Sequence, residues 1–306
     1  MKGTCSGEWG WGFNNGLDSW QQNPKPETLT ADANNDGNIA DPRRVRYGIA
    51  AENYLDLLKK RLTRAKDDHD SIKVDGTFRG LLVGVLRKVL GAIGPLDPTN
   101  WRIWPRNPET MIGLPGLDNL QFCISGVLNQ GIPGDFIETG VWKGGASIFM
   151  RAMLKAQGDT SRKVWVADSF SGLPRPNPEK YPADKGDNLW TDASLAISLD
   201  EVKKNFSRYG MLDDQVEFLV GWFRDTLPRA PIERIAVLRL DGDMYESTID
   251  SLRYLCPKLS TGGYVIIDDY DLYGCRMATD DFRRENGIVE KMGQFGRNGV
   301  FWRRTN

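Results

Sequence analysis

Two apolar segments in the second half of this 306-residue chain are each followed directly by aspartates. These aspartates are Asp241, Asp243, Asp268, Asp269 and Asp271. Carboxylates about 4 Å apart repel one another by several kcal/mol at an effective dielectric constant of about 20, so a cation must neutralise them. Ligands made only of oxygen atoms favour a hard cation such as Mg²⁺. Aspartates also cap helix N-termini, but capping alone explains poorly why they follow two strands. The sequence therefore predicts a metal site.

A glycine-rich turn follows an earlier strand-like segment and runs from Glu138 through Gly140 and Gly144 to Ser147. Glycines let the backbone turn tightly and approach a ligand, and the next helix presents free amide groups at its N-terminus. The spacing is neither the dinucleotide pattern GxGxxG nor a P-loop, so it suits a ligand without a pyrophosphate. A tight turn with a purely structural role is the alternative.

The next two strands end in residues suited to a nucleoside. Asp168, followed by Ser169, stands at the tip of the strand after the glycine-rich turn. An acidic residue there typically accepts hydrogen bonds from two ribose hydroxyls. Trp222 follows Gly221 at the end of the third strand and could lie against an adenine ring, although a tryptophan of the core fits the pattern nearly as well. The first strands therefore predict a ligand that contains a nucleoside.

Strand and helix patterns alternate from Gly134 onward, and they predict the scaffold that positions these residues. The predicted strands are 135–139, 164–167, 215–220, 234–240 and 264–267, with a closing edge strand within 295–304. The predicted helices are 51–62, 81–93, 117–128, 145–154, 198–209 and 247–259. Short strands that are apolar on both faces indicate an α/β fold with a mostly parallel sheet and helices on both faces. Such sheets bind ligands beyond the carboxyl ends of their strands.

Composition and charge exclude several classes of protein. The chain has 40 basic and 41 acidic side chains, so it lacks the basic excess that a nucleic-acid partner requires. Scattered cysteines, no signal segment and no apolar stretch long enough to span a bilayer predict a cytoplasmic protein without a membrane partner. The one histidine, His69, lies in a charged run that is typical of a solvated surface. Acid–base chemistry is therefore expected from carboxylates.

With these residues in place, the chain resembles the macrocin O-methyltransferase family. Six stretches carry the likeness in the same order: Thr110–Gly113, Glu138–Gly145, Val166–Pro174, Gly221–Pro228, Leu240–Thr248 and Gly263–Tyr270. The likeness covers about residues 101–304, and 51–63 is similar to the family's N-terminal helix. It implies a Rossmann-like class I methyltransferase sheet, S-adenosylmethionine as methyl donor, Mg²⁺, and a glycosylated small molecule whose sugar hydroxyl is methylated.

The resemblance also implies roles for single residues. Asp241, Asp268 and Asp269 match the family's magnesium ligands, and Asp243 matches its proposed general base, so Asp241 and Asp243 are the expected catalytic residues. The cofactor-binding candidates in the matched stretches are Thr110, Met111, Glu138, Gly140, Gly144, Ser147, Asp168, Ser169, Gly221 and Trp222. In the implied mechanism the metal binds and acidifies the acceptor hydroxyl while Asp243 takes its proton.

Three regions follow from this comparison. Residues 1–45 match nothing in the family and predict an irregular extension; a calcium-loop-like stretch there has Arg43 in place of its last ligand, which favours a surface turn. We expect residues 46–100 to form a helical lid or dimerisation segment and residues 101–306 to form the methyltransferase domain. Within that domain, 101–116 is expected to run over the surface. By analogy with related methyltransferases, a homodimer or higher homo-oligomer is expected.

Two other functions stay open at the level of the residues. A metal-dependent hydrolase could use the same carboxylates with an activated water, but it leaves the glycine-rich turn and Asp168 unexplained. A catalytically inactive protein could bind carbohydrate through its tryptophan-rich N-terminus, but the complete set of carboxylates argues against it. Binding of an adenosyl ligand tests the hydrolase alternative, and glycan binding without a cofactor tests the other.

Overall fold

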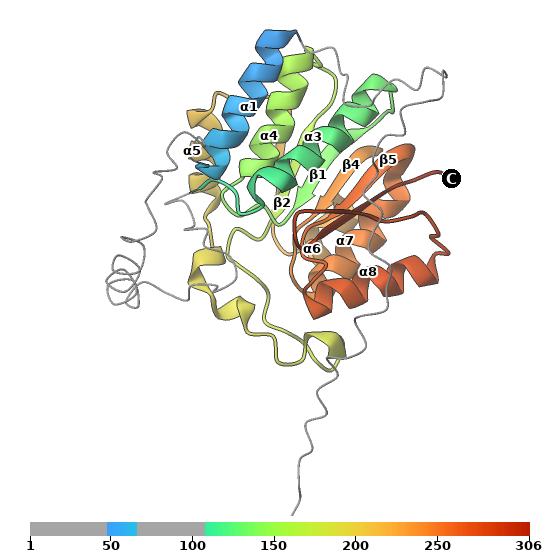
Figure 1. The fold of residues 1–306 in the computed structure, drawn as a ribbon. Coiled ribbons are helices and arrows are strands. Elements are labelled where there is room, and N and C mark those ends of the chain that lie inside the picture. The colour runs from blue at the N-terminus through green and yellow to red at the C-terminus, as the bar shows by residue number, and fades with distance from the viewer. Residues whose placement is uncertain (1–47, 66–107) are drawn as a thin grey trace, which may run out of the picture. The chain divides into compact units, whose positions relative to one another are not determined.

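A seven-stranded sheet forms the centre of the part of the chain that the computed structural model describes, residues 48–65 and 108–306 (Figure 1). Its strands are β1 (Asp135–Thr139), β2 (Val164–Asp168), β3 (Val216–Val220), β4 (Ile235–Leu240), β5 (Leu259–Ile267), β6 (Gly293–Phe295) and β7 (Gly299–Arg303). The spatial order is β3-β2-β1-β4-β5-β7-β6, with the first five strands parallel and β7 antiparallel to both neighbours. The predicted α/β fold with a mostly parallel sheet is confirmed.

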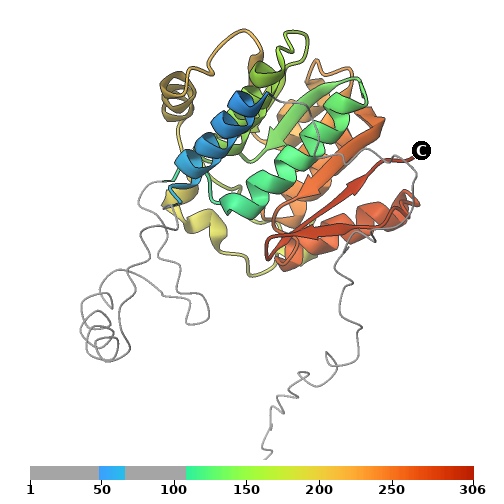
Figure 2. The ribbon, with the colours of Figure 1, turned by 45° about the horizontal axis from the view of Figure 1, so that its top comes forward.

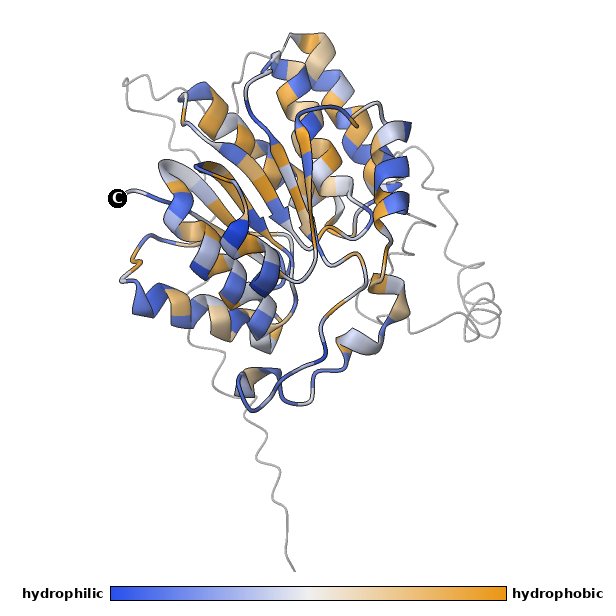
Figure 3. Ribbon diagram, turned by 180° about the vertical axis from the view of Figure 1, so that it is seen from behind, coloured by the Kyte–Doolittle hydropathy of each residue, from blue (hydrophilic) through white to orange (hydrophobic). Residues whose placement is uncertain are grey.

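Helices cover both faces of the sheet, as predicted (Figures 1 and 2). One face carries α1 (Ile49–Thr63), α3 (Gly113–Asn129), α4 (Gly145–Gln157) and α5 (Leu199–Arg208), and the other carries α6 (Phe223–Thr226), α7 (Tyr245–Leu255) and α8 (Tyr273–Glu285). Successive strand residues point to opposite faces, so Phe136 packs in the first core and Ile137 in the second. Figure 3 shows the consequence: the central strands are mostly apolar, whereas the helices carry both apolar and hydrophilic residues along their length.

Two elements differ from the prediction at the C-terminal end. Helix α8 was not predicted, although Cys275, Ala278 and Phe282 recur at helical spacing and are buried. The expected edge strand within 295–304 is a hairpin in which β7 pairs with β5 and β6 forms the edge. In this hairpin, β7 pairs with the backbone groups along the edge of β5, and β6 pairs with the outer side of β7.

The N-terminal predictions are described only in part. The extension 1–45, His69 and the helix predicted over 81–93 lie outside the described residues, and the domain boundaries stay predictions. Helix α1 buries Leu55 and Leu62 against α3 and α4. The surface course expected for 101–116 is wrong for 108–110, which are buried, whereas 111–115 are exposed or half-buried. None of the described helices combines the length and apolarity that a bilayer crossing needs.

Candidate active site

The candidate site lies where the strand order reverses, between β1 and β4. Connections lead from β1 outward through β2 and β3, and from β4 outward through β5, so the carboxyl ends of these two strands flank a crevice. The Asp241 amide donates to the Thr139 carbonyl at 2.8 Å and holds the two strand ends together. Gly140 has a φ of +83°, and a Cβ atom there would lie 1.7 Å from the Asp241 carbonyl oxygen. Only glycine fits this close approach.

A pocket with about 710 Å³ of empty space opens at this crevice. Eight residues of the predicted site line it: Met111, Gly140, Asp168, Ser169, Gly221, Trp222, Asp241 and Asp243. They come from the turns after β1, β2, β3 and β4 and from the segment before α3. The structure thus brings together residues that the sequence distributes over more than a hundred positions.

Four predicted cofactor-binding residues, Thr110, Glu138, Gly144 and Ser147, are not among those that line the pocket. Thr110 and Glu109 lie against Gly145, where a Cβ atom would be 2.4 Å from the Glu109 carbonyl oxygen. Gly144, with a φ of +85°, lies against Val202 and Phe206 of α5. These contacts support the turn after β1 from behind the pocket.

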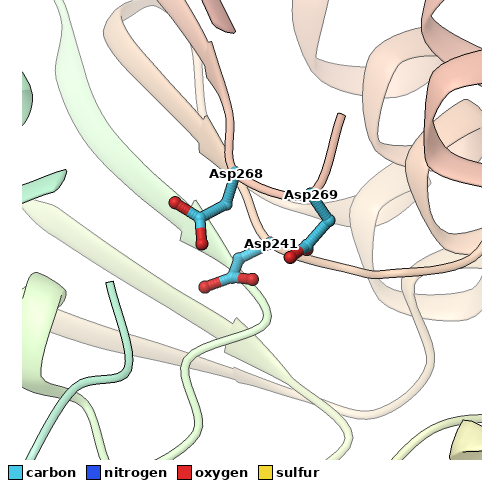
Figure 4. Close-up of side chains that lie close together, drawn as sticks. All are labelled: Asp241, Asp268 and Asp269. Carbon is cyan, nitrogen blue, oxygen red and sulfur yellow. The ribbon is translucent and has the colours of Figure 1, made fainter. Parts of the chain in front are cut away.

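Asp241, Asp268 and Asp269 converge at the ends of β4 and β5 (Figure 4). Each offers one oxygen atom, and the three oxygen atoms lie within 4.8 Å of one another. Oδ2 of Asp269 is buried without a hydrogen-bond partner. None of the three is the N-cap residue of α7 or α8, since these positions are Met244 and Leu272. The donor set and the unpartnered oxygen therefore fit a hard divalent cation.

Arg239, which sequence reasoning missed, is 1% exposed and lies beside this cluster. Its Nη1 donates to Oε1 of Glu138 at 2.6 Å and to Oδ2 of Asp241 at 2.9 Å, and its Nη2 lies 2.8 Å from Oδ1 of Asp268. Glu138 also accepts a hydrogen bond from the hydroxyl of Ser147. The hydrogen bonds of Glu138 thus link Ser147 to Arg239.

The period of the strands explains how these charges meet. Glu138 and Arg239 are register partners on β1 and β4, and Arg239 pairs with Ile266 on β5. Asp241 and Asp268 each stand two residues beyond a register partner, so they point to the same face of the sheet. A signal existed in the sequence: one arginine in the apolar strand 235–240, two residues before an aspartate.

Four carboxyl groups of the site have a raised pKa, those of Glu138, Asp243, Asp268 and Asp269. Burial raises the pKa of Glu138 to about 7, although Arg239 and Ser147 lower it. Burial likewise raises the pKa of Asp268 to about 7 against the opposing effect of Arg239. Burial and the charge of Asp241 raise the pKa of Asp243 to about 7 and the pKa of Asp269 well above its usual value. One arginine does not neutralise this many acids.

Backbone strain is concentrated around the pocket. Of the described residues, four other than glycine have a positive φ, and three of these are Trp142, Phe170 and Asp243, in the turns after β1, β2 and β4. Such conformations cost about 1–3 kcal/mol each and persist where the surroundings fix them. The Asp168 carboxylate fixes two turns, because it accepts from the Val141 amide at 2.8 Å and from the Phe170 amide at 2.7 Å.

The residues predicted to bind a nucleoside also line the pocket. With two amides bound, the Asp168 carboxylate retains capacity to accept from ligand hydroxyls. Trp222 lines the pocket beside Gly221, and its ring is not part of the buried core. Sequence reasoning missed Glu246 and Asp250 on α7, which are 5% and 7% exposed and also line the pocket.

The comparisons with known proteins agree with this geometry. A family model described as Macrocin-O-methyltransferase (TylF) matches residues 51–304. The chain is 55% identical over 205 residues to 8-demethyl-8-(2,3-dimethoxy-alpha-L-rhamnosyl)-tetracenomycin-C 4'-O-methyltransferase of Streptomyces olivaceus, which covers 67% of this chain and 78% of that protein. It is 51% identical over 205 residues to mycinamicin III 3''-O-methyltransferase of Micromonospora griseorubida, which covers 66% and 81%, respectively.

A solved structure, that of the O-methyltransferase NovP, is similar with a TM-score of 0.70 and 41% sequence identity. The match covers 84% of this chain and 100% of that chain. The predicted methyltransferase sheet is therefore confirmed.

Replacing the buried cation tests the charge arrangement. Arg239→Met removes the positive charge beside Glu138, Asp241 and Asp268. Removing one partner of a buried ion pair lowers the unfolding free energy by about 3–5 kcal/mol. Without Arg239, Glu138 and Asp268 bind protons still more tightly in the folded protein than in the unfolded one, so the loss of unfolding free energy grows as pH rises from 5.5 to 8. Urea denaturation at both pH values measures it. The control is Arg151→Met, because the partner of Arg151 is the partly exposed Asp213, which water can solvate. An equal loss at both pH values for Arg239→Met would contradict the arrangement.

Added Mg²⁺ should stabilise the protein more at pH 8 than at pH 6. Since the folded pKa of Asp268 is about 7 and an unfolded aspartate has a pKa of about 3.9, ionising this group lowers stability as pH rises between these values. A cation binds the ionised form and must displace protons below pH 7. Thermal unfolding with and without Mg²⁺ at both pH values measures the difference, with Asp268→Asn as the variant that removes the shift. An equal shift in that variant would argue against this cation site.

Proposed function

The chain belongs to the macrocin O-methyltransferase family, and we propose that it transfers the methyl group of S-adenosylmethionine to a sugar hydroxyl of a glycosylated small molecule. The observation that carries the proposal is the pocket at the switch point, which is lined by the nucleoside candidates Asp168 and Trp222 and also by Asp241 of the carboxylate cluster. The predicted O-methyltransferase activity is confirmed by the named relatives. Neither the hydrolase nor the inactive protein accounts for both sets of residues.

The nucleoside candidates would hold the methyl donor. We assign the ribose hydroxyls to Asp168, whose carboxylate already lies between the turns after β1 and β2. Trp222 and Gly221 would flank the adenine, since both line the pocket at the end of β3. Bound in this way, the donor supplies an activated methyl group, and the residues of the pocket fix its direction.

Asp243 is the proposed general base. A sugar hydroxyl is a weak acid, so its proton must be taken as the oxygen attacks the methyl carbon. The pKa of Asp243, about 7, suits a base that works near neutral pH. Asp243 lines the pocket, and its backbone adopts a φ of 58° there. The proton therefore passes from the acceptor hydroxyl to Asp243.

The residues proposed to hold Mg²⁺ are Asp241, Asp268 and Asp269. When bound, the cation would supply positive charge that lowers the pKa of a hydroxyl beside it. Arg239 engages Asp241 and Asp268 from the side of the sheet and limits how far their carboxylates can turn. Two of the three ligands are therefore preorganised by the protein itself.

The substrate class rests on the two relatives, whose names describe methylation of glycosylated natural products. We propose the same class of acceptor for this chain. The oligomeric state stays a prediction.

The activity is tested with purified protein, S-adenosylmethionine and a library of glycosylated natural products that includes mycinamicin III and the demethyl-tetracenomycin glycoside. The expected result is one added methyl group on a sugar, abolished by EDTA and restored by Mg²⁺, detected by mass spectrometry with fragmentation. The matching aglycones are the controls. Methylation of an aglycone, or of no library member despite binding of S-adenosylhomocysteine, would contradict the proposed acceptor class.

Asp243→Asn separates the chemistry from cofactor binding. The amide keeps the size of the side chain but cannot take a proton, so kcat should fall by about 10²–10⁴-fold while the Kd of S-adenosylhomocysteine is unchanged. Turnover and calorimetry measure the two effects. Asp214→Asn is the matched control, because Asp214 is an exposed aspartate before β3 that lies outside the pocket lining. Wild-type turnover in Asp243→Asn would remove the assigned role.

A further inference from the structure

A long crossing segment, residues 169–198, connects β2 to α5 and forms one wall of the pocket. Gly172, Leu173, Pro174 and Leu195 of this segment line the pocket. The segment is yellow in Figure 1, where it extends beyond the carboxyl ends of the strands and reaches α8. Near one end, the indole nitrogen of Trp142 donates to the Ser194 carbonyl at 2.9 Å. The segment is thus fastened to the turn after β1.

The middle of the crossing segment is fastened by Asp184, the last residue of a short 3₁₀ turn, Pro182–Asp184. Asp184 is 2% exposed. Its Oδ1 accepts from the Tyr245 amide at 2.7 Å and its Oδ2 accepts from the Glu246 amide at 3.0 Å. Tyr245 and Glu246 are the first two residues of α7, whose own N-cap residue, Met244, provides no side-chain bond. Asp184 therefore caps α7 from 61 positions away in the sequence.

The cap lies between α7, which follows β4, and α8, which follows β5. A Cβ atom on Gly274, in the first turn of α8, would be 2.8 Å from Oδ1 of Asp184 and 2.9 Å from the Tyr245 amide nitrogen. Glycine at this position lets α8 approach the cap. The rings of Tyr181 and Tyr245 lie 5.8 Å apart and add an apolar contact between the crossing segment and α7.

Asp243 lies two residues before the first residue of α7. Its backbone is in the left-handed conformation, which costs energy for any residue other than glycine. The chain from Asp243 to Tyr245 has one intervening residue, so fixing the Tyr245 and Glu246 amides fixes the path that leads to Asp243. On the other side of Asp243, the backbone of Asp241 is fixed by the hydrogen bond that its amide donates to the Thr139 carbonyl. The short connection between these two anchors leaves the backbone of Asp243 little freedom.

We propose that Asp184 is a positioning residue for Asp243. By capping α7 with both carboxylate oxygens, Asp184 holds the general base in its left-handed conformation and connects it to the crossing segment that forms one wall of the pocket. The role of Asp243 in this statement rests on the proposed function. The capping contacts themselves are independent of that function.

The test compares Asp184→Asn and Asp184→Ala with a matched control, Asp192→Asn. Asp192 belongs to the same crossing segment and also accepts from a backbone amide, but it is exposed and that amide belongs to Ser194 of the segment itself rather than to α7. With the acceptor found in the library, Asp184→Asn should lower kcat by about 10- to 100-fold through misplacement of the base, and Asp184→Ala by more. The KM values and the Kd of S-adenosylhomocysteine should match the wild type, as should every constant of Asp192→Asn.

The double variant Asp184→Asn/Asp243→Asn distinguishes positioning from general destabilisation. If Asp184 acts through Asp243, the double variant turns over as slowly as Asp243→Asn alone. A further loss in the double variant, or a wild-type kcat in Asp184→Asn, would overturn the proposal.

Crystal structures of the wild type and Asp184→Asn give a readout that needs no acceptor. The proposal predicts that Asp243 leaves its positive φ or turns its carboxylate out of the pocket in the variant, and an unchanged Asp243 would refute it. A wild type that methylates no acceptor while Asp243 moves in the variant would count against the proposed function alone. An active wild type with an unaffected variant would count against the positioning role alone.

Discussion

The arrangement of the site depends on one buried cation, the guanidinium of Arg239, between acids from three neighbouring strands. Bringing Glu138, Asp241 and Asp268 together inside a sheet would cost far too much without it, because each ion loses its hydration. The planar guanidinium can donate in several directions at once and so matches oxygens on both sides of β4. The remaining negative charge is what fits the cluster to the proposed divalent cation.

This charge arrangement is possible only because the surrounding elements are rigid. Two hydrophobic cores hold the sheet from either face, and the strand ends are locked by short backbone contacts at Gly140 and Asp241. Strained residues at Trp142, Phe170 and Asp243 can then be maintained at the pocket. Side chains from remote parts of the chain, Asp168 and Asp184, fix the turns that carry them. The packing of the two hydrophobic cores thus stabilises backbone conformations that the turns would not adopt alone.

The sequence predicts what is local and misses what depends on distant partners. The five parallel strands, the glycine-rich turn and the aspartates at the strand ends follow from short patterns, and the structure places most of the resulting site residues around one pocket. The burial of Arg239 depends on Glu138, 101 positions away, and the role of Asp184 depends on amides 61 positions away. No pattern in a single sequence gives such pairings. Glu138 and Ser147 illustrate the limit: they belong to a predicted cofactor motif, yet their hydrogen bonds support Arg239.

The central claim is that the aspartates after β4 and β5 and the acid after β2 serve one reaction centre. A crystal structure with Mn²⁺ and S-adenosylhomocysteine, with anomalous scattering used to locate the metal, tests it most directly. The account predicts one Mn²⁺ ion held by Asp241, Asp268 and Asp269, and ribose hydroxyls that donate to Asp168 in the same pocket. An ion bound elsewhere with the three aspartates unligated, or a nucleoside outside this pocket, would contradict it.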